Sequence, residues 1–128
     1  MDIMDRINVM KEYGIVDDTA YNDLVTIVST MRKQFDITLT EENAGVMITH
    51  IASAFGRNRS GEMIDAVAAA ASGGLREDPG YDKAVEILSE LRRNIKNDLS
   101  EIEQEYVLLH LCTLLYSIDK NRRKEAMQ

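Results

Sequence analysis

The sequence predicts an all-α fold built as one domain. Proline occurs once, aromatic residues make up only 5% of the chain, and strong helix formers fill long stretches. No run of β-branched residues alternates convincingly with polar ones, which is the pattern of a half-buried strand. With 128 residues, of which 45% are hydrophobic, the chain is long enough to bury a core without disulfides.

The first two expected helices are separated by a glycine and a group of capping residues. Gly14 ends a short helix over 2–13, because glycine readily terminates helices. Residues 17–19, two aspartates and a threonine, offer side chains that cap a second helix ending near residue 35. Its apolar side carries Leu24, Val25, Ile27, Val28, Met31 and Phe35.

A third helix and a short linking helix are expected next. Thr40 is a cap followed by two first-turn glutamates, which suit the positive end of a helix dipole, so we expect a helix over 40–59. After a break at 59–61, the alanine-rich stretch 63–71 predicts a short, closely packed helix. Ser-Gly-Gly at 72–74 ends it.

The next expected helix begins at an Asp-Pro pair. Asp78 acts as a cap, and Pro79 occupies the first helical position, where its missing N–H is no loss. The apolar stripe of this helix comprises Val85, Leu88, Leu91 and Ile95.

The last expected helix starts at a capping box and runs over 100–117. Ser100 and Glu103 have the spacing at which each side chain satisfies the other's backbone N–H. A charged tail over 119–128 follows, which we expect to be frayed. The apolar side includes Ile102, Val107, Leu108, Leu111, Leu114 and Leu115.

Charge and hydropathy argue against nucleic-acid binding, a membrane span and secretion. The chain has 22 acidic and 15 basic residues, and the one basic cluster is at 122–124, so direct nucleic-acid binding is not expected. No stretch approaches the ~20 apolar residues of a membrane span, and the acidic start is unlike a secretory signal. The single Cys112, in an apolar setting, fits a helix core in a reducing compartment. We therefore expect a cytoplasmic protein.

His50 and His110 are the two imidazoles of the chain, and each lies mid-helix among apolar residues. One interpretation is structural, in which each is a buried histidine satisfied by a hydrogen bond. The residues around them favour a functional interpretation.

Helical periodicity predicts that polar side chains lie next to each of the two histidines. Arg57 follows His50 by two helical turns and can point back at it, as a phosphate on that imidazole would require. A solvated last-turn cation explains Arg57 equally well. Glu103, Tyr106 and His110 share one helix face at the i, i+3, i+7 spacing. Glu103 could instead serve only as part of the helix cap, and Tyr106 could be only a half-buried aromatic residue of the core.

Metal and enzyme chemistry are poorly supported. His110 and Cys112 are two residues apart, on different sides of a helix, and neither histidine has a strong ligand at i+3 or i+4. No nucleophile lies on a sharp glycine-flanked turn, and no glycine-rich loop opens a helix to hold phosphate. We expect no metal, no cofactor and no catalytic residues.

Two segments around the histidines resemble one family. Residues 48–57, ITHIASAFGR, pair a histidine-aliphatic step with an arginine seven residues after the histidine. Residues 99–111, LSEIEQEYVLLHL, place an acid seven and an aromatic four positions before the second histidine. Together with Pro79, Tyr81 and Ala84 in the middle, they resemble the PTS regulation domain, a helical module of bacterial sugar-responsive antiterminators and activators.

The resemblance implies a fold and a function. It implies a compact bundle of about five helices, with two antiparallel pairs and a short linking helix, often dimeric. It also implies that His50 and His110 accept phosphate from the phosphocarrier protein or a sugar-specific enzyme II, with Arg57, Glu103 and Tyr106 in support. The sequence departs from the family at Thr49, where many members carry an acid, and over 64–70, where many carry Asn-Pro.

The expected organisation follows from the same resemblance. An N-terminal extension over 1–16 precedes the regulation domain over 17–118, and the charged tail over 119–128 ends the chain. The domain is expected to stand alone, as a homodimer without an output domain. The alternative is a structural helical adaptor or dimerisation module in which both histidines belong to the core.

Overall fold

The computed structural model describes the backbone of residues 1–60 and 74–126, and the side chains of 1–56 and 74–125. Within these residues the chain is all-α and has no strand, which confirms the predicted fold class. The linking helix expected over 63–71 lies outside the described residues. The elements are α1 (Ile3–Glu12), α2 (Asp18–Phe35), α3 (Glu41–Ser60), the 3-10 turn η1 (Leu75–Glu77), α5 (Tyr81–Asn94) and α6 (Glu101–Ala126).

Local capping explains where the first helices begin. The Asp17 carboxylate accepts a hydrogen bond from the N–H of Ala20 at 2.8 Å, which starts α2 as expected. At the start of α3, the Thr40 hydroxyl accepts from the N–H of Asn43 at 3.1 Å. The Asn43 side chain accepts from the N–H of Thr40 at 2.8 Å in return. This reciprocal pair is a capping box with asparagine in place of glutamate.

The start of α5 differs from the expectation. The helix begins at Tyr81, two residues after Pro79. The Asp78 carboxylate accepts the N–H of Gly80 at 2.8 Å, and the Asp78 carbonyl accepts the N–H of Tyr81 at 3.0 Å. Asp78 therefore closes a turn of its own before the helix begins, because aspartate side chains readily bond the backbone two residues on.

The end of α6 also differs. The tail over 119–128 was expected to be frayed, but the helix continues to Ala126. The tail consists mostly of good helix formers, and Arg123 Nε lies 3.2 Å from Asp119 Oδ2 at the i, i+4 spacing. Basic residues in the last turn also suit the negative end of the helix dipole.

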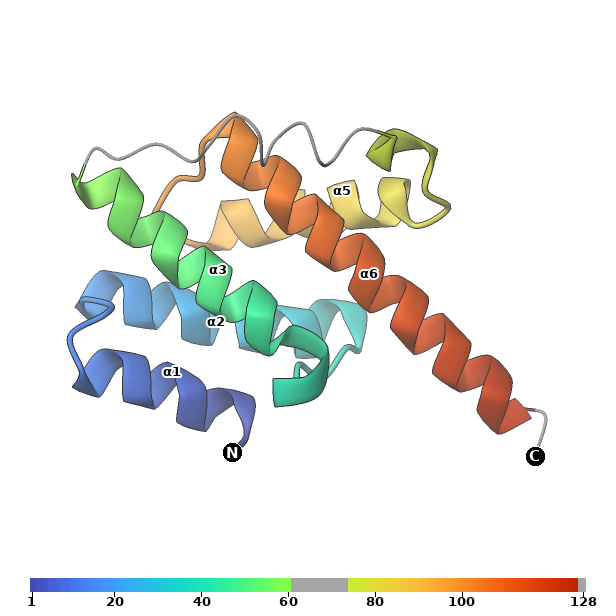
Figure 1. Cartoon of the computed structure of the whole chain (residues 1–128), viewed down its shortest axis with the longest axis horizontal. Coiled ribbons are helices and arrows are strands. Elements are labelled where there is room, and N and C mark those ends of the chain that lie inside the picture. The colour runs from blue at the N-terminus through green and yellow to red at the C-terminus, as the bar shows by residue number, and fades with distance from the viewer. Residues whose placement is uncertain (61–73, 127–128) are drawn as a thin grey trace.

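The helices form a ring of contacts. In order, α1 packs on α2, α2 on α5, α5 on α6, α6 on α3 and α3 on α1, with α2 and α3 also in contact. Figure 1 shows α2 and α3 running in opposite directions, as do α5 and α6, and shows α6 extending past the other helices at its C-terminal end. None of the helices in the described ranges is long and apolar enough to cross a membrane.

The core lies inside this ring and agrees with most of the expected apolar faces. On α5 the buried stripe is Ala84, Ile87, Leu88 and Leu91, whereas Val85 is 37% exposed and was wrongly expected to be buried. The i, i+3, i+4, i+7 spacing of these four residues explains the correction. The largest fully buried side chains are those of Ile7, Leu24, Ile27, Met31, Ile48, Ile51, Ile87, Leu91, Leu111, Leu114, Glu103 and Val107.

Replacing glycine by alanine is expected to change the free energy of unfolding in opposite directions at Gly14 and Gly56. Gly14 has a φ of +74°, and an added Cβ there would meet nothing within 4 Å, so Gly14→Ala acts through backbone strain alone. We expect it to lower the free energy of unfolding by about 1 kcal/mol. Gly56 lies inside α3 with equally open space, so Gly56→Ala is expected to raise it by up to about 1 kcal/mol. Urea unfolding of both variants measures the two signs, and equal signs would contradict the prediction.

Candidate functional site

α3 places His50 at the border between core and surface. Ile48 and Ile51 on the same helix are 0% exposed, and they fix the face of α3 that points into the bundle. The His50 side chain lies beside that face and is 17% exposed. The imidazole is therefore mostly desolvated yet still reaches the surface.

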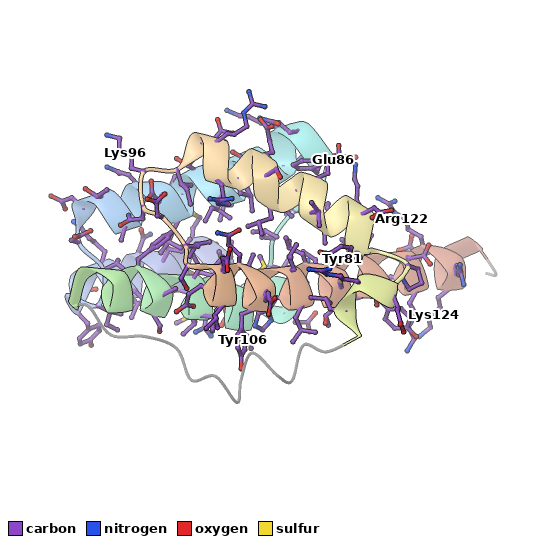
Figure 2. All side chains as sticks on the ribbon, turned by 90° about the horizontal axis from the view of Figure 1, so that it is seen from above. Tyr81, Glu86, Lys96, Tyr106, Arg122 and Lys124 are labelled. Carbon is purple, nitrogen blue, oxygen red and sulfur yellow. The ribbon has the colours of Figure 1, made fainter. Side chains whose placement is uncertain are left out.

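α6 provides the rest of the site. Val107 and Leu111 anchor the helix in the core at 0% exposure. Glu103 points inward with them and is only 2% exposed, whereas Tyr106 and His110 are half-buried. Figure 2 shows Tyr106 on the side of α6 that faces away from α5.

The two histidines meet between α3 and α6, although sixty residues separate them in the sequence. Their ring centroids are 5.7 Å apart, with the planes tilted by 45°. The Tyr106 ring stacks on His50 at 4.6 Å and 20°, and lies 6.4 Å from His110. Stacking of this kind restricts rotation of the His50 ring.

Glu103 completes the cluster. Its Oε2 lies 3.3 Å from His50 Nε2. The backbone N–H of Glu103 donates to the Ser100 hydroxyl at 3.2 Å, so the expected serine cap is present. Of the capping box expected at this helix start, the structure thus has the serine half, and the Glu103 side chain contacts His50. Four of the five expected site residues are thus together: His50, Glu103, Tyr106 and His110.

The fifth, Arg57, lies on α3, and its side chain falls outside the described residues. Its expected role beside His50 stays a prediction.

Burial and the neighbouring His50 ring both change the pKa of His110. Burial first, and then the charge of His50, lower the pKa of the His110 imidazole below its ordinary value. Both causes disfavour the cation, because burial removes its hydration and a second imidazolium repels it. At neutral pH His110 is therefore a neutral base.

This lowered pKa predicts a pH-dependent stability. On acidification the unfolded chain protonates His110 before the folded chain does, so the contribution is complete above about pH 6.5 and is lost as the pH falls toward the folded pKa. We expect the urea midpoint to drop between about pH 7.5 and about pH 5.5, and the drop to be smaller in His110→Gln. An equal drop in the variant would show that other groups cause it.

A second polar cluster adjoins the site, and the sequence pattern did not indicate it. Arg6 of α1 donates from Nε to the Glu41 carboxylate at 2.8 Å and from Nη1 to the Thr49 hydroxyl at 2.9 Å. The hydrogen bond from Arg6 lowers the pKa of Glu41. Thr49, the residue before His50, thereby links α3 to α1. The spacing of residues in the sequence does not predict this contact.

Cys112 is buried at 4% exposure, as expected for a core position. Burial first, and then Asp78, raise the pKa of its thiol to about 11. The thiolate is therefore strongly disfavoured at neutral pH. Among the described residues, no cluster of three or more His, Cys, Asp or Glu side chains is placed to hold a metal ion.

Fold and site together define a small all-helical protein with two histidines, a tyrosine and a buried glutamate at the contact of two helices. No protein-family model matches the chain, and no solved structure matches it. The chain is similar to "Uncharacterized protein YhfY" of Escherichia coli (strain K12). The two are 23% identical over 106 residues, which cover 83% of this chain and 88% of that protein.

Proposed function

We propose that this chain is a PTS regulation domain, a cytoplasmic regulatory module that responds to sugar phosphotransferase activity through phosphorylation of His50 or His110. The observation that carries the proposal is the meeting of the two imidazoles at 5.7 Å, on helices from the two halves of the chain. The resemblance had named these residues from sequence alone. Glu103 and Tyr106, named with them, contact His50.

The chemistry of the site supports a histidine acceptor. A phosphoacceptor imidazole must be neutral at working pH and must reach a protein donor. His110 meets the first requirement through its lowered pKa, and both side chains retain some exposure. The donor would be the phosphocarrier protein or a sugar-specific enzyme II.

A phosphate at this position would act on the packing of α3 and α6. It adds about −1.5 to −2 charge at neutral pH, next to the buried carboxylate of Glu103 and between two helices in direct contact. The phosphate would either be repelled by the Glu103 carboxylate or attract a cation. Either effect would change the packing of α3 on α6 and so the surface that these helices offer to a second subunit. We expect this change to act on the contact between the two subunits of a homodimer.

Phosphotransfer tests the proposal. The purified chain is incubated with phosphoenolpyruvate, enzyme I and the phosphocarrier protein, with and without an enzyme II, and its intact mass is measured under non-acidic conditions. We expect a gain of one phosphate, reduced or abolished in His50→Gln or His110→Gln. Omission of enzyme I is the control for transfer, and circular dichroism shows that each variant is folded.

The rival function is a helical adaptor or dimerisation module in which the histidines only pack. It predicts no mass gain in any mixture from a folded chain, with the same two substitutions changing stability alone. That result would overturn the proposed function.

A further inference from the structure

The two histidines of the site differ in the groups that surround them. A carboxylate oxygen of the buried Glu103 lies 3.3 Å from Nε2 of His50, and Tyr106 stacks on the His50 ring at 4.6 Å. His110 makes tilted ring contacts with His50 and Tyr106, but no hydrogen bond or ion pair within residues 1–60 and 74–126 engages its imidazole. His50 is therefore held beside an anion, whereas His110 is not.

We propose that His110 is the phosphoacceptor of the pair, and that His50, paired with Glu103, is the cation that stabilises the phosphoryl group on it. This inference rests on the proposed function and assigns a different role to each histidine within it. One consequence is that the chain carries one phosphate at a time.

The position of charge within the pair favours His110 as the acceptor. The Glu103 carboxylate stabilises the imidazolium form of His50 by its charge, and its burial weakens the screening of that attraction by water. Burial, and then the charge of His50, lower the pKa of His110, so His110 is the ring of the pair that stays neutral. An imidazolium has no lone pair on either nitrogen, so the neutral ring is the nucleophile.

The separation of the rings places the cation beside the phosphorylated product. The centroids of His50 and His110 are 5.7 Å apart, on helices that are anchored in the core. The N–H groups of an imidazolium are strong, charge-assisted donors to phosphate oxygens, and donors that are already in place need little rearrangement. A second phosphoryl group, on His50, would replace this cation by an anion next to both Glu103 and the first phosphate.

The transfer balances without a further reactant. The lone pair of a His110 nitrogen forms a bond to the phosphorus of the donor's phosphohistidine. The donor's N–P bond breaks, and its electron pair returns to the donor nitrogen. The other nitrogen of His110 keeps its proton, and the protons on His50 stay in place as donors to the phosphate oxygens.

Mapping of the phosphorylated residue by mass spectrometry of peptides, under non-acidic conditions, tests the assignment. The full chain is treated in one sample with phosphoramidate, a small donor that needs no protein. A second sample receives phosphoenolpyruvate, enzyme I and the phosphocarrier protein. We expect one phosphate per chain, on His110, and none on a folded His110→Gln variant.

The two donors separate this inference from the proposed function. Labelling of His110 by phosphoramidate without transfer from the phosphocarrier protein would support the assignment while the proposed function fails. Label that appears first on His50, label on both histidines of one chain, or a folded chain that neither donor labels would overturn the inference.

Glu103→Gln tests the charge that keeps His50 protonated. The substitution preserves the shape of the side chain but removes its charge, so we expect phosphoramidate to label His50 as well as His110. Glu101→Gln is the matched control, because it removes the same charge from an exposed position in the first turn of the same helix and should leave the label on His110 alone. A packing role for Glu103 would change stability but not the labelled residue, so label on His110 alone in folded Glu103→Gln would contradict its role.

His50→Gln removes the cation and keeps the acceptor. We expect phosphoramidate to label His110 about tenfold more slowly in this variant, because one charge-assisted hydrogen bond to the phosphoryl group is lost. The rates are compared at about pH 8, where an imidazole with an ordinary or lowered pKa is neutral, so that a change in the protonation of His110 does not contribute. An unchanged rate in the folded variant would contradict the role of His50.

Discussion

Asp23→Ala is expected to lower the free energy of unfolding by about 2–3 kcal/mol. The Asp23 carboxylate is 3% exposed and accepts three hydrogen bonds from the turn between α5 and α6. The backbone N–H of Lys96 donates at 2.9 Å, and Asn97 donates from its backbone at 2.8 Å and from its side chain at 2.7 Å. Alanine would leave these donors without their ionised acceptor, the kind of hydrogen bond that contributes most.

Urea unfolding measures this loss, and Asn22→Ala is the matched control. Asn22 is the exposed neighbour of Asp23 on α2, so its truncation is expected to stay within about 0.5 kcal/mol of the parent. Asp23→Asn should be intermediate, since its amide keeps one acceptor oxygen but turns an NH₂ toward donors. Equal stability of Asp23→Ala and Asn22→Ala would show that the turn holds without the carboxylate.

The same turn bears on the histidine site. It leads into α6, and Glu103 lies in the first turn of that helix. A loosened turn is therefore expected to shift the NMR signals of His50, although Asp23 lies on a different helix. This would distinguish a contact that orients α6 from one that only adds stability.

Local features of the fold could be predicted from sequence, because their causes lie within a few residues. The Asp17 cap, the Thr40 cap and the end of α1 shortly before Gly14 depend on neighbouring side chains and a single backbone angle. The start of α5 was missed by two residues, because the Asp78 side chain had two competing local uses, a helix cap and a turn.

The site was predictable only in part, for a related reason. The common face of Glu103, Tyr106 and His110 follows from helix periodicity, and the structure has that face. The contact of His50 with His110 depends on how α3 packs on α6, which no local pattern determines. The bond from Arg6 to Thr49 spans 43 residues and was missed for the same reason.

Leu111→Ala is expected to lower the free energy of unfolding by about 3 kcal/mol, within the range for a fully buried leucine. Leu111 is 0% exposed in the middle of α6, where that helix packs on α3 and α5. Its loss removes apolar contacts and leaves a cavity that a close-packed bundle fills only in part.

Val46→Ala on α3 is the control for that substitution, because Val46 is 73% exposed and its truncation leaves no cavity. Its effect should stay within about 0.5 kcal/mol, with the same denaturant dependence in both variants. If Leu111→Ala destabilised the chain no more than Val46→Ala, the contact of α6 with α3 and α5 would not be a tightly packed core. The site would be affected as well, because that packing sets the 5.7 Å separation of His50 and His110.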